Sequence, residues 1–166
     1  MRPGAVTMVT PEPGDWALLP GAQFADAYQV QTRAGLDAPA AAAALFEHQP
    51  AWISGLMRLR DSLVTPLGLK TTTGELAAPQ GTIGVFPVIE AGPRRMVLGF
   101  ADKHLDFRVV VAAAEIGGAS QITVTTVVLT HNALGAIYLT TILPFHVLIV
   151  RTLLAALGRR SVANRR

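Results

Sequence analysis

The sequence predicts a single α+β domain in which an antiparallel sheet wraps around a long apolar C-terminal helix. Three observations support this fold class. A run of 18 residues, 133–150, contains no Asp, Glu, Lys or Arg. Four β-rich runs joined by short turns precede it, as in an antiparallel meander. One more strand and two short helices come before those runs. Because a sheet must cover its apolar face, the final helix is expected to lie over it.

The first predicted elements are a strand and two helices. Residues 23–32 alternate large apolar with smaller or polar side chains, as a strand does. Asp37 is expected to cap a short helix through the alanine run 40–44, because its carboxylate can accept first-turn N–H groups. A second helix is expected over residues 51–65, with an apolar stripe at helical spacing. The polar segment 71–81 is expected to be a loop, with a pocket lid as the functional alternative.

The predicted meander leads directly into the final helix. A two-residue turn at Gly117 and Gly118 sets the pairing of the last two strands and places His104 opposite His131. Asn132 is expected to cap the helix that follows. The four strands of the meander are predicted at residues 82–89, 96–100, 104–114 and 121–131.

Composition limits the compartment and the partners. The chain has 166 residues, of which 51% are hydrophobic and 15% charged, so it can bury a core. It has no cysteine, which excludes disulfides and suggests a reducing, cytoplasmic location. Four arginines lie in the basic tail 159–166 and the rest of the chain is close to neutral, so no nucleic-acid partner is expected. Residues 1–14 are expected to be a flexible lead and residues 15–158 the domain.

The apolar segment 133–150 also reaches the length of a membrane span. A C-terminal anchor would carry the tail arginines across the bilayer, against the positive-inside rule. Thr140, His146 and Arg151 interrupt the apolar run. Projected at about 100° per residue, Thr140 and Arg151 fall on one narrow stripe, and the remaining circumference is largely apolar. The expectation is therefore a buried helix and no membrane span.

The predicted hairpin gathers the most polar candidate site. By the two-residue period of a strand, His104, Asp106 and Arg108 share one sheet face with His131. Two imidazoles and a carboxylate could bind a metal or relay protons. The favoured interpretation is instead a polar network at the sheet edge, in which Asp106 and Arg108 balance each other. No tight ligand motif is present, so no metal is expected.

Four further residues are candidates for ligand contact. His146 projects away from the polar stripe of the final helix and should point into the body. It is interpreted either as a satisfied core histidine or as a hydrogen-bonding group in a pocket wall. Arg60 flanks an apolar helix stripe, where it could pair with a carboxylate ligand or only extend to solvent. Trp52 and Tyr138 are most simply core residues.

Blocks over residues 51–61, 66–70, 99–108, 130–132 and 138–146 occur in order within about residues 15–158. Together they resemble a bacterial family, domain of unknown function 2867 (DUF2867). The resemblance implies a START-like, helix-grip fold of the SRPBCC superfamily, whose relatives often enclose a hydrophobic cavity. It also implies that relatives can be joined to NAD(P)-binding oxidoreductase domains, although this chain has no Gly-x-Gly-x-x-Gly. Val147 stands where an Arg is expected in the family, which weakens a role for a cation there.

The preferred hypothesis is a domain that binds a small hydrophobic molecule in a cavity between the sheet and the C-terminal helix, without a cofactor. One alternative is an enzyme that acts on an apolar substrate, with His104, His131 and Asp106, or His146, as acid–base groups. No catalytic motif supports it. The other alternative is an accessory module that docks onto an oxidoreductase or forms a homodimer.

Overall fold

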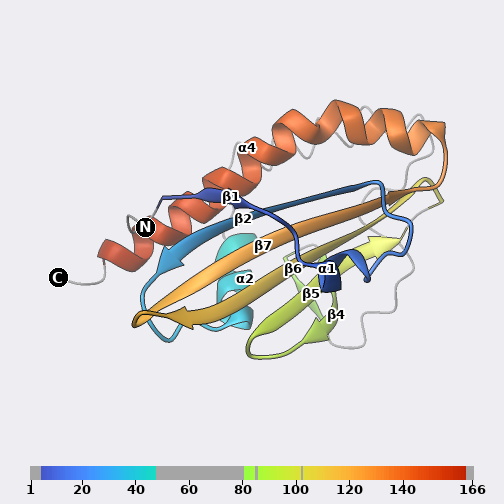
Figure 1. Cartoon of the computed structure of the whole chain (residues 1–166). Coiled ribbons are helices and arrows are strands. Elements are labelled where there is room, and N and C mark those ends of the chain that lie inside the picture. The colour runs from blue at the N-terminus through green and yellow to red at the C-terminus, as the bar shows by residue number, and fades with distance from the viewer. Residues whose placement is uncertain (1–4, 48–80, 85, 102, 164–166) are drawn as a thin grey trace.

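The computed structural model describes residues 5–47, 81–84, 86–101 and 103–163 (Figure 1). It confirms a mixed α+β fold in which one curved antiparallel sheet is accompanied by a long C-terminal helix. The predicted helix 51–65 and nearly all of the loop 71–81 lie outside the described residues. The elements are β1 (Thr7–Val9), α1 (Pro13–Trp16), β2 (Phe24–Thr32), α2 (Ala38–Phe46), β3 (Thr82–Ile83), β4 (Phe86–Ala91), β5 (Arg95–Ala101), β6 (Leu105–Ile116), β7 (Ala119–Thr130) and α4 (Ala133–Ala163).

The sheet has seven strands in the order β1-β2-β7-β6-β5-β4-β3, and neighbours are antiparallel. Its centre is the β6–β7 hairpin. Gly117 and Gly118 have φ angles of 60° and 75°, which a two-residue hairpin turn of this kind requires. Ile116 therefore pairs with Ala119, and the predicted register holds along the whole hairpin.

Three boundaries differ from the sequence prediction. Part of the expected flexible lead 1–14 is ordered, because β1 pairs with β2 and α1 begins at Pro13. The predicted strand 82–89 is two strands, β3 and β4, separated by Gly84 at φ 59°. The expected frayed tail at 159–166 is helical as far as Ala163, because the buried Leu157 anchors this end of α4 and no Pro interrupts it.

The main core lies on the sheet face that packs against α2 and α4, called here the helix-covered face. α2 contributes buried alanines and Leu45, and Asp37 caps it as predicted, with Oδ1 accepting the N–H of Ala40 at 2.8 Å. The strand residues of this core come from the β6–β7 hairpin and from its two neighbours, β2 and β5. They include Tyr28, Val30, Met96, Leu98, Val109, Val111, Ile122 and Val124.

The N-terminal segment covers the opposite face, called here the α1-covered face. Val97, Val110 and Val127 point to this side and are fully buried. Asp15 on α1 is buried and pairs with Arg95 at 3.2 Å, which holds the segment onto β5. The pattern of residues 1–14 alone does not indicate that this segment covers a sheet face.

α4 is less buried than the sequence predicted. Asn132 caps it as expected, with Oδ1 accepting the N–H of Gly135 at 3.0 Å. The C-terminal half is held by the buried Leu153, Leu154 and Leu157. In the preceding half the side turned away from the sheet is exposed, and only 6% of the most apolar window is buried. The stretch Ala133–Arg160 is long and apolar enough to cross a membrane by length and composition.

The expectation that α4 is buried was therefore wrong for this half. The physical reason is that the sheet contacts α4 mainly through β2 and β7, along one side of the helix (Figure 1).

Candidate functional site

A carboxylate and an imidazole meet between the sheet and α4. Asp26 lies on β2 between Phe24 and Tyr28 and points to the helix-covered face, where its side chain is only 4% exposed. His146 lies on α4, and its Nε2 is 3.0 Å and 3.1 Å from the two carboxylate oxygens of Asp26. The inward direction predicted for His146 is thus confirmed. The sequence pattern did not single out Asp26 as a site residue.

Tyr28 adds a second contact to the same carboxylate. Burial, followed by the nearby charge of Asp26 and a hydrogen bond to it, raises the pKa of Tyr28. Arg151 has the opposite and smaller effect on this pKa. The neutral Tyr28 hydroxyl is therefore the donor and Asp26 the acceptor. Asp26 is held by a phenol from its own strand and by an imidazole from α4.

These contacts fix the orientation of the His146 ring. The Phe24 ring packs nearly perpendicular to it, with centroids 6.2 Å apart. Because Nε2 faces Asp26, Nδ1 is the nitrogen left to contact another group, and it has no hydrogen-bond partner within the described ranges. The side chain of His146 retains 19% exposure. An oriented imidazole of this kind can hold a polar group or accept a proton.

Aromatic side chains continue this site along the helix-covered face. The rings of Phe46 and Phe86 lie 5.3 Å apart, those of Phe86 and Phe107 lie 5.7 Å apart, and those of Phe100 and Phe107 lie 4.2 Å apart. All three contacts in this row are edge-to-face in type, and each ring remains partly exposed. Leu139, Leu143 and His146 on α4 are also only partly buried. Partly buried apolar side chains thus lie on the same sheet face as the Asp26–His146 pair.

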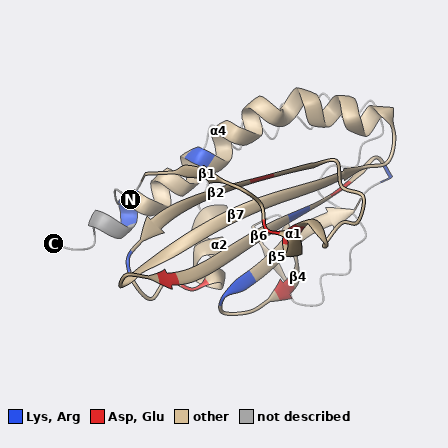
Figure 2. Ribbon diagram, in the orientation of Figure 1, with Lys and Arg blue, Asp and Glu red and all other residues tan. Residues whose placement is uncertain are grey.

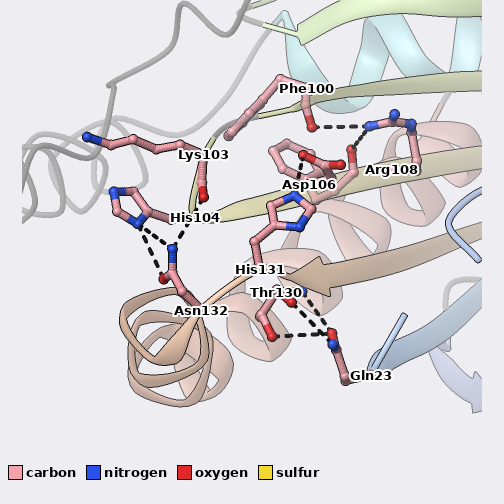
Figure 3. A network of polar contacts seen from close by, with 10 residues as sticks. Gln23, Phe100, Lys103, His104, Asp106, Arg108, Thr130, His131 and Asn132 are labelled. Atoms are coloured by element: carbon pink, nitrogen blue, oxygen red, sulfur yellow. Dashed lines mark hydrogen bonds and ion pairs between the residues drawn. The ribbon is translucent and has the colours of Figure 1, made fainter. Parts of the chain in front are cut away.

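The predicted cluster at the end of the hairpin has a different geometry (Figure 3). The backbone N–H of His131 donates to the carbonyl of His104 at 2.9 Å, as the register predicts. Their side chains have different partners. His131 Nε2 pairs with Asp106 at 3.1 Å, whereas His104 contacts Asn132.

The contact with Asn132 indicates the tautomer of a neutral His104 ring. Asn132 Oδ1 caps α4, so its Nδ2 is the group that donates to His104 Nδ1 at 3.0 Å. Nδ1 is then the acceptor and Nε2 carries the proton. That Nε2 is buried and has no hydrogen-bond partner.

Arg108 completes the polar network without reaching either imidazole. Its Nη1 donates to the carbonyls of Phe107 at 2.8 Å and Phe100 at 3.1 Å (Figure 3). Burial lowers the pKa of Arg108, and the charge of Asp106 partly offsets that effect. By strand alternation Asp106 and Arg108 lie on the α1-covered face, opposite Asp26. No group of three metal-ligating side chains occurs in the ranges that the structure describes.

The remaining sequence-predicted site residues are Trp52, Arg60 and Tyr138. Trp52 and Arg60 lie outside the described residues. Tyr138 lies in the first part of α4 and is partly buried. The enzyme hypothesis that combined His104, His131 and Asp106 required these groups to converge, and His104 and His131 do not. His146 is therefore the sequence-predicted residue with the most suitable surroundings for a ligand.

Comparisons with known proteins give one match. The model of a family described as "Protein of unknown function (DUF2867)" matches residues 18–153. No curated protein and no solved structure matches the chain.

Proposed function

We propose that this chain, which belongs to the DUF2867 family, binds a small and mostly apolar molecule between the sheet and α4. The Asp26–His146 pair would hold the polar end of that molecule. The aromatic row of Phe46, Phe86, Phe107 and Phe100 would contact its apolar part. The long helix over a curved sheet also supports the START-like, helix-grip relationship that the sequence suggests.

The observation that carries the proposal is a buried, oriented carboxylate–imidazole pair on the sheet face that also holds partly exposed aromatic rings. Small-molecule sites are lined mainly by apolar and aromatic side chains, with a few polar groups that fix orientation. A purely structural role would not require the aromatic rings nearby to remain partly exposed. A bound molecule would cover these rings and the partly buried Leu139 and Leu143 together.

The proposal is tested on purified full-length protein. Native mass spectrometry, together with organic extraction and mass analysis of the extract, should reveal a co-purified small molecule. Stripped protein should then bind the fluorescent probe 1-anilinonaphthalene-8-sulfonate saturably, because the probe combines apolar rings with one anionic group. A single unliganded mass, an empty extract and no saturable probe binding would together remove the proposal.

A matched pair of substitutions locates the site. His146→Gln replaces the imidazole with a side-chain amide that can still donate to Asp26, so it should weaken probe binding. His131→Gln makes the same change in the His–Asp pair on the other face of the sheet and should leave probe binding unchanged. Equal effects of the two substitutions would argue against the assigned site.

A second function would use the same pair. An imidazole oriented by a buried carboxylate can act as a general base, so His146 could catalyse proton transfer on a bound molecule. Once the co-purified molecule is identified, its chemical change on incubation with wild type and not with His146→Gln would support catalysis. Unchanged recovery of the molecule would leave binding as the function.

A further inference from the structure

We propose that the outward side of α4 docks onto an anionic lipid surface, with the helix lying parallel to the membrane plane. The surface, called here the outer stripe, consists of Ile137, Thr141, Pro144, Phe145, Leu148, Arg151 and Arg159. Its apolar residues Ile137 and Leu148 project to the side of α4 opposite His146, whereas Arg151 lies at the margin, close enough to Tyr28 to affect its pKa. The proposal does not depend on ligand binding.

The first observation is apolar exposure concentrated on one helix. Ile137 is 64% exposed, Leu148 54% and Phe145 50%. At about 100° per residue, Ile137 and Leu148 fall within about 20° of each other and Phe145 lies at the margin. A folded chain seldom leaves large apolar side chains grouped in this way unless another surface covers them.

The second observation is the charge on the same side of the helix. Arg151 and Arg159 are exposed and fall within about 40° of the apolar stripe. Residues 133–166 contain no Asp or Glu. Figure 2 shows the charged residues of α4 as basic only and confined to its C-terminal half. No ion pair joins Arg151, Arg159 or Arg160 to a carboxylate in the described part of the chain.

Apolar side chains and unpaired cations on one side of a helix fit a membrane interface. The apolar groups enter the boundary between headgroups and acyl chains, and the cations contact lipid phosphates. A second copy of the chain fits less well. If two outer stripes packed together, their arginines would lie close to one another with no acidic residue on either helix to neutralise them. Anionic headgroups supply that negative charge.

The inward side of α4 argues for docking rather than crossing. His146 is paired with Asp26, and Leu153, Leu154 and Leu157 are buried in the protein core. Insertion of the whole helix into a bilayer would break these contacts and expose the carboxylate of Asp26. A helix that lies in the interface retains them, because only its outer stripe enters the lipid.

The test is sedimentation of the full-length protein with vesicles. One preparation is phosphatidylcholine alone, and the other is an equimolar mixture of phosphatidylcholine and phosphatidylglycerol. We expect binding to the anionic vesicles, weaker binding to the neutral ones and release by high salt. Leu148→Ser should lower the partition coefficient about fivefold. Arg151→Gln and Arg159→Gln should each lower it about fivefold as well.

The control variants change residues that are exposed to a similar degree but lie outside α4. Ile116→Ser changes an exposed apolar side chain at the far end of β6, and Arg33→Gln changes an exposed cation after β2; neither should alter vesicle binding. Circular dichroism of each variant establishes that the fold is retained.

Three results would overturn the proposal. The first is no binding to either vesicle, or binding that the outer-stripe variants leave unchanged. The second is a dimer in sedimentation equilibrium that Leu148→Ser dissociates, without vesicle binding, since the stripe would then join two copies. The third is binding that resists alkaline carbonate extraction, which would indicate insertion across the bilayer.

Discussion

The Asp26–His146 pair should be energetically coupled much more strongly than the second His–Asp pair of the domain. The two pairs have nearly equal lengths, 3.0 Å for Asp26–His146 and 3.1 Å for Asp106–His131. They differ in burial. The side chains of Asp26 and His146 are 4% and 19% exposed, whereas those of Asp106 and His131 are 18% and 37% exposed. Burial, and not distance, is therefore the variable that the comparison isolates.

The expected magnitudes follow from this difference. Removal of one partner of a buried pair costs about 3–5 kcal/mol, because a charge remains buried without compensation. His146→Ala should fall near the lower end, about 3 kcal/mol, since the Tyr28 hydroxyl still donates to Asp26. The coupling energy of the buried pair should be about 2 kcal/mol. For Asp106–His131 it should stay below about 1 kcal/mol, as solvent screens the more exposed pair.

The assay is urea unfolding of two double-mutant cycles at neutral pH. One cycle combines Asp26→Asn with His146→Ala, and the other combines Asp106→Asn with His131→Ala. Free energies of unfolding from linear extrapolation give each coupling energy as the departure from additivity. Equal coupling in the two cycles would refute the reasoning, because Asp26 would then not depend on His146 for its burial.

Three further predictions concern the scaffold. Gly135→Ala should destabilise the domain by about 2 kcal/mol in thermal unfolding, because the new Cβ would lie 2.1 Å from a backbone carbonyl oxygen, whereas Gly14→Ala meets no atom within 4 Å and should be nearly neutral. Asp37→Ala should cost about 1 kcal/mol in the same assay through loss of the α2 cap, and an unchanged midpoint would contradict that role. The hydrogen bond from the Gly35 N–H lowers the pKa of Glu115 from its ordinary value of 4.5. This stabilisation is present above that value and is lost as the pH falls through the lowered pKa, so Glu115→Gln should make unfolding less dependent on pH in acid.

The sheet register was predictable because one turn determines it. Two adjacent glycines between β-rich runs indicate a two-residue hairpin, and a pairing fixed at one point extends along both strands. The faces of Phe107 and Asp106 then follow from strand alternation. The prediction did not extend to side-chain partners. The backbones of His104 and His131 are opposite each other, yet the ring of His104 contacts Asn132 and the ring of His131 pairs with Asp106.

Asp26 carried a local signal that the strand pattern obscured. Asp26 lies two residues from both Phe24 and Tyr28 on the same strand, so its side chain points to the same face as theirs, toward the core. A carboxylate at such a position requires a compensating partner, because an unpaired buried charge is strongly unfavourable. The sequence could have indicated the need for that partner. It could not identify His146, 120 residues away, since local periodicity does not determine which strand a distant helix contacts.

The exposure of α4 escaped prediction for a related reason. Helical projection gives the direction of each side chain and correctly turned His146 inward. It does not state what lies beyond the opposite side, and apolar composition was equated with burial. The capped start of α4 and the buried Leu153, Leu154 and Leu157 fix the helix near both ends. Between these points one side faces Asp26 and the aromatic row, and the other faces outward.

This arrangement makes the two proposals separable on one helix. His146 and Leu148 are two residues apart but project to nearly opposite sides. His146→Gln should therefore weaken probe binding without altering vesicle binding, and Leu148→Ser should do the reverse. Both measurements on both variants complete the test. If each substitution changed both activities, the sides of α4 would not act independently, and release of the bound molecule would have to be linked to docking at the membrane.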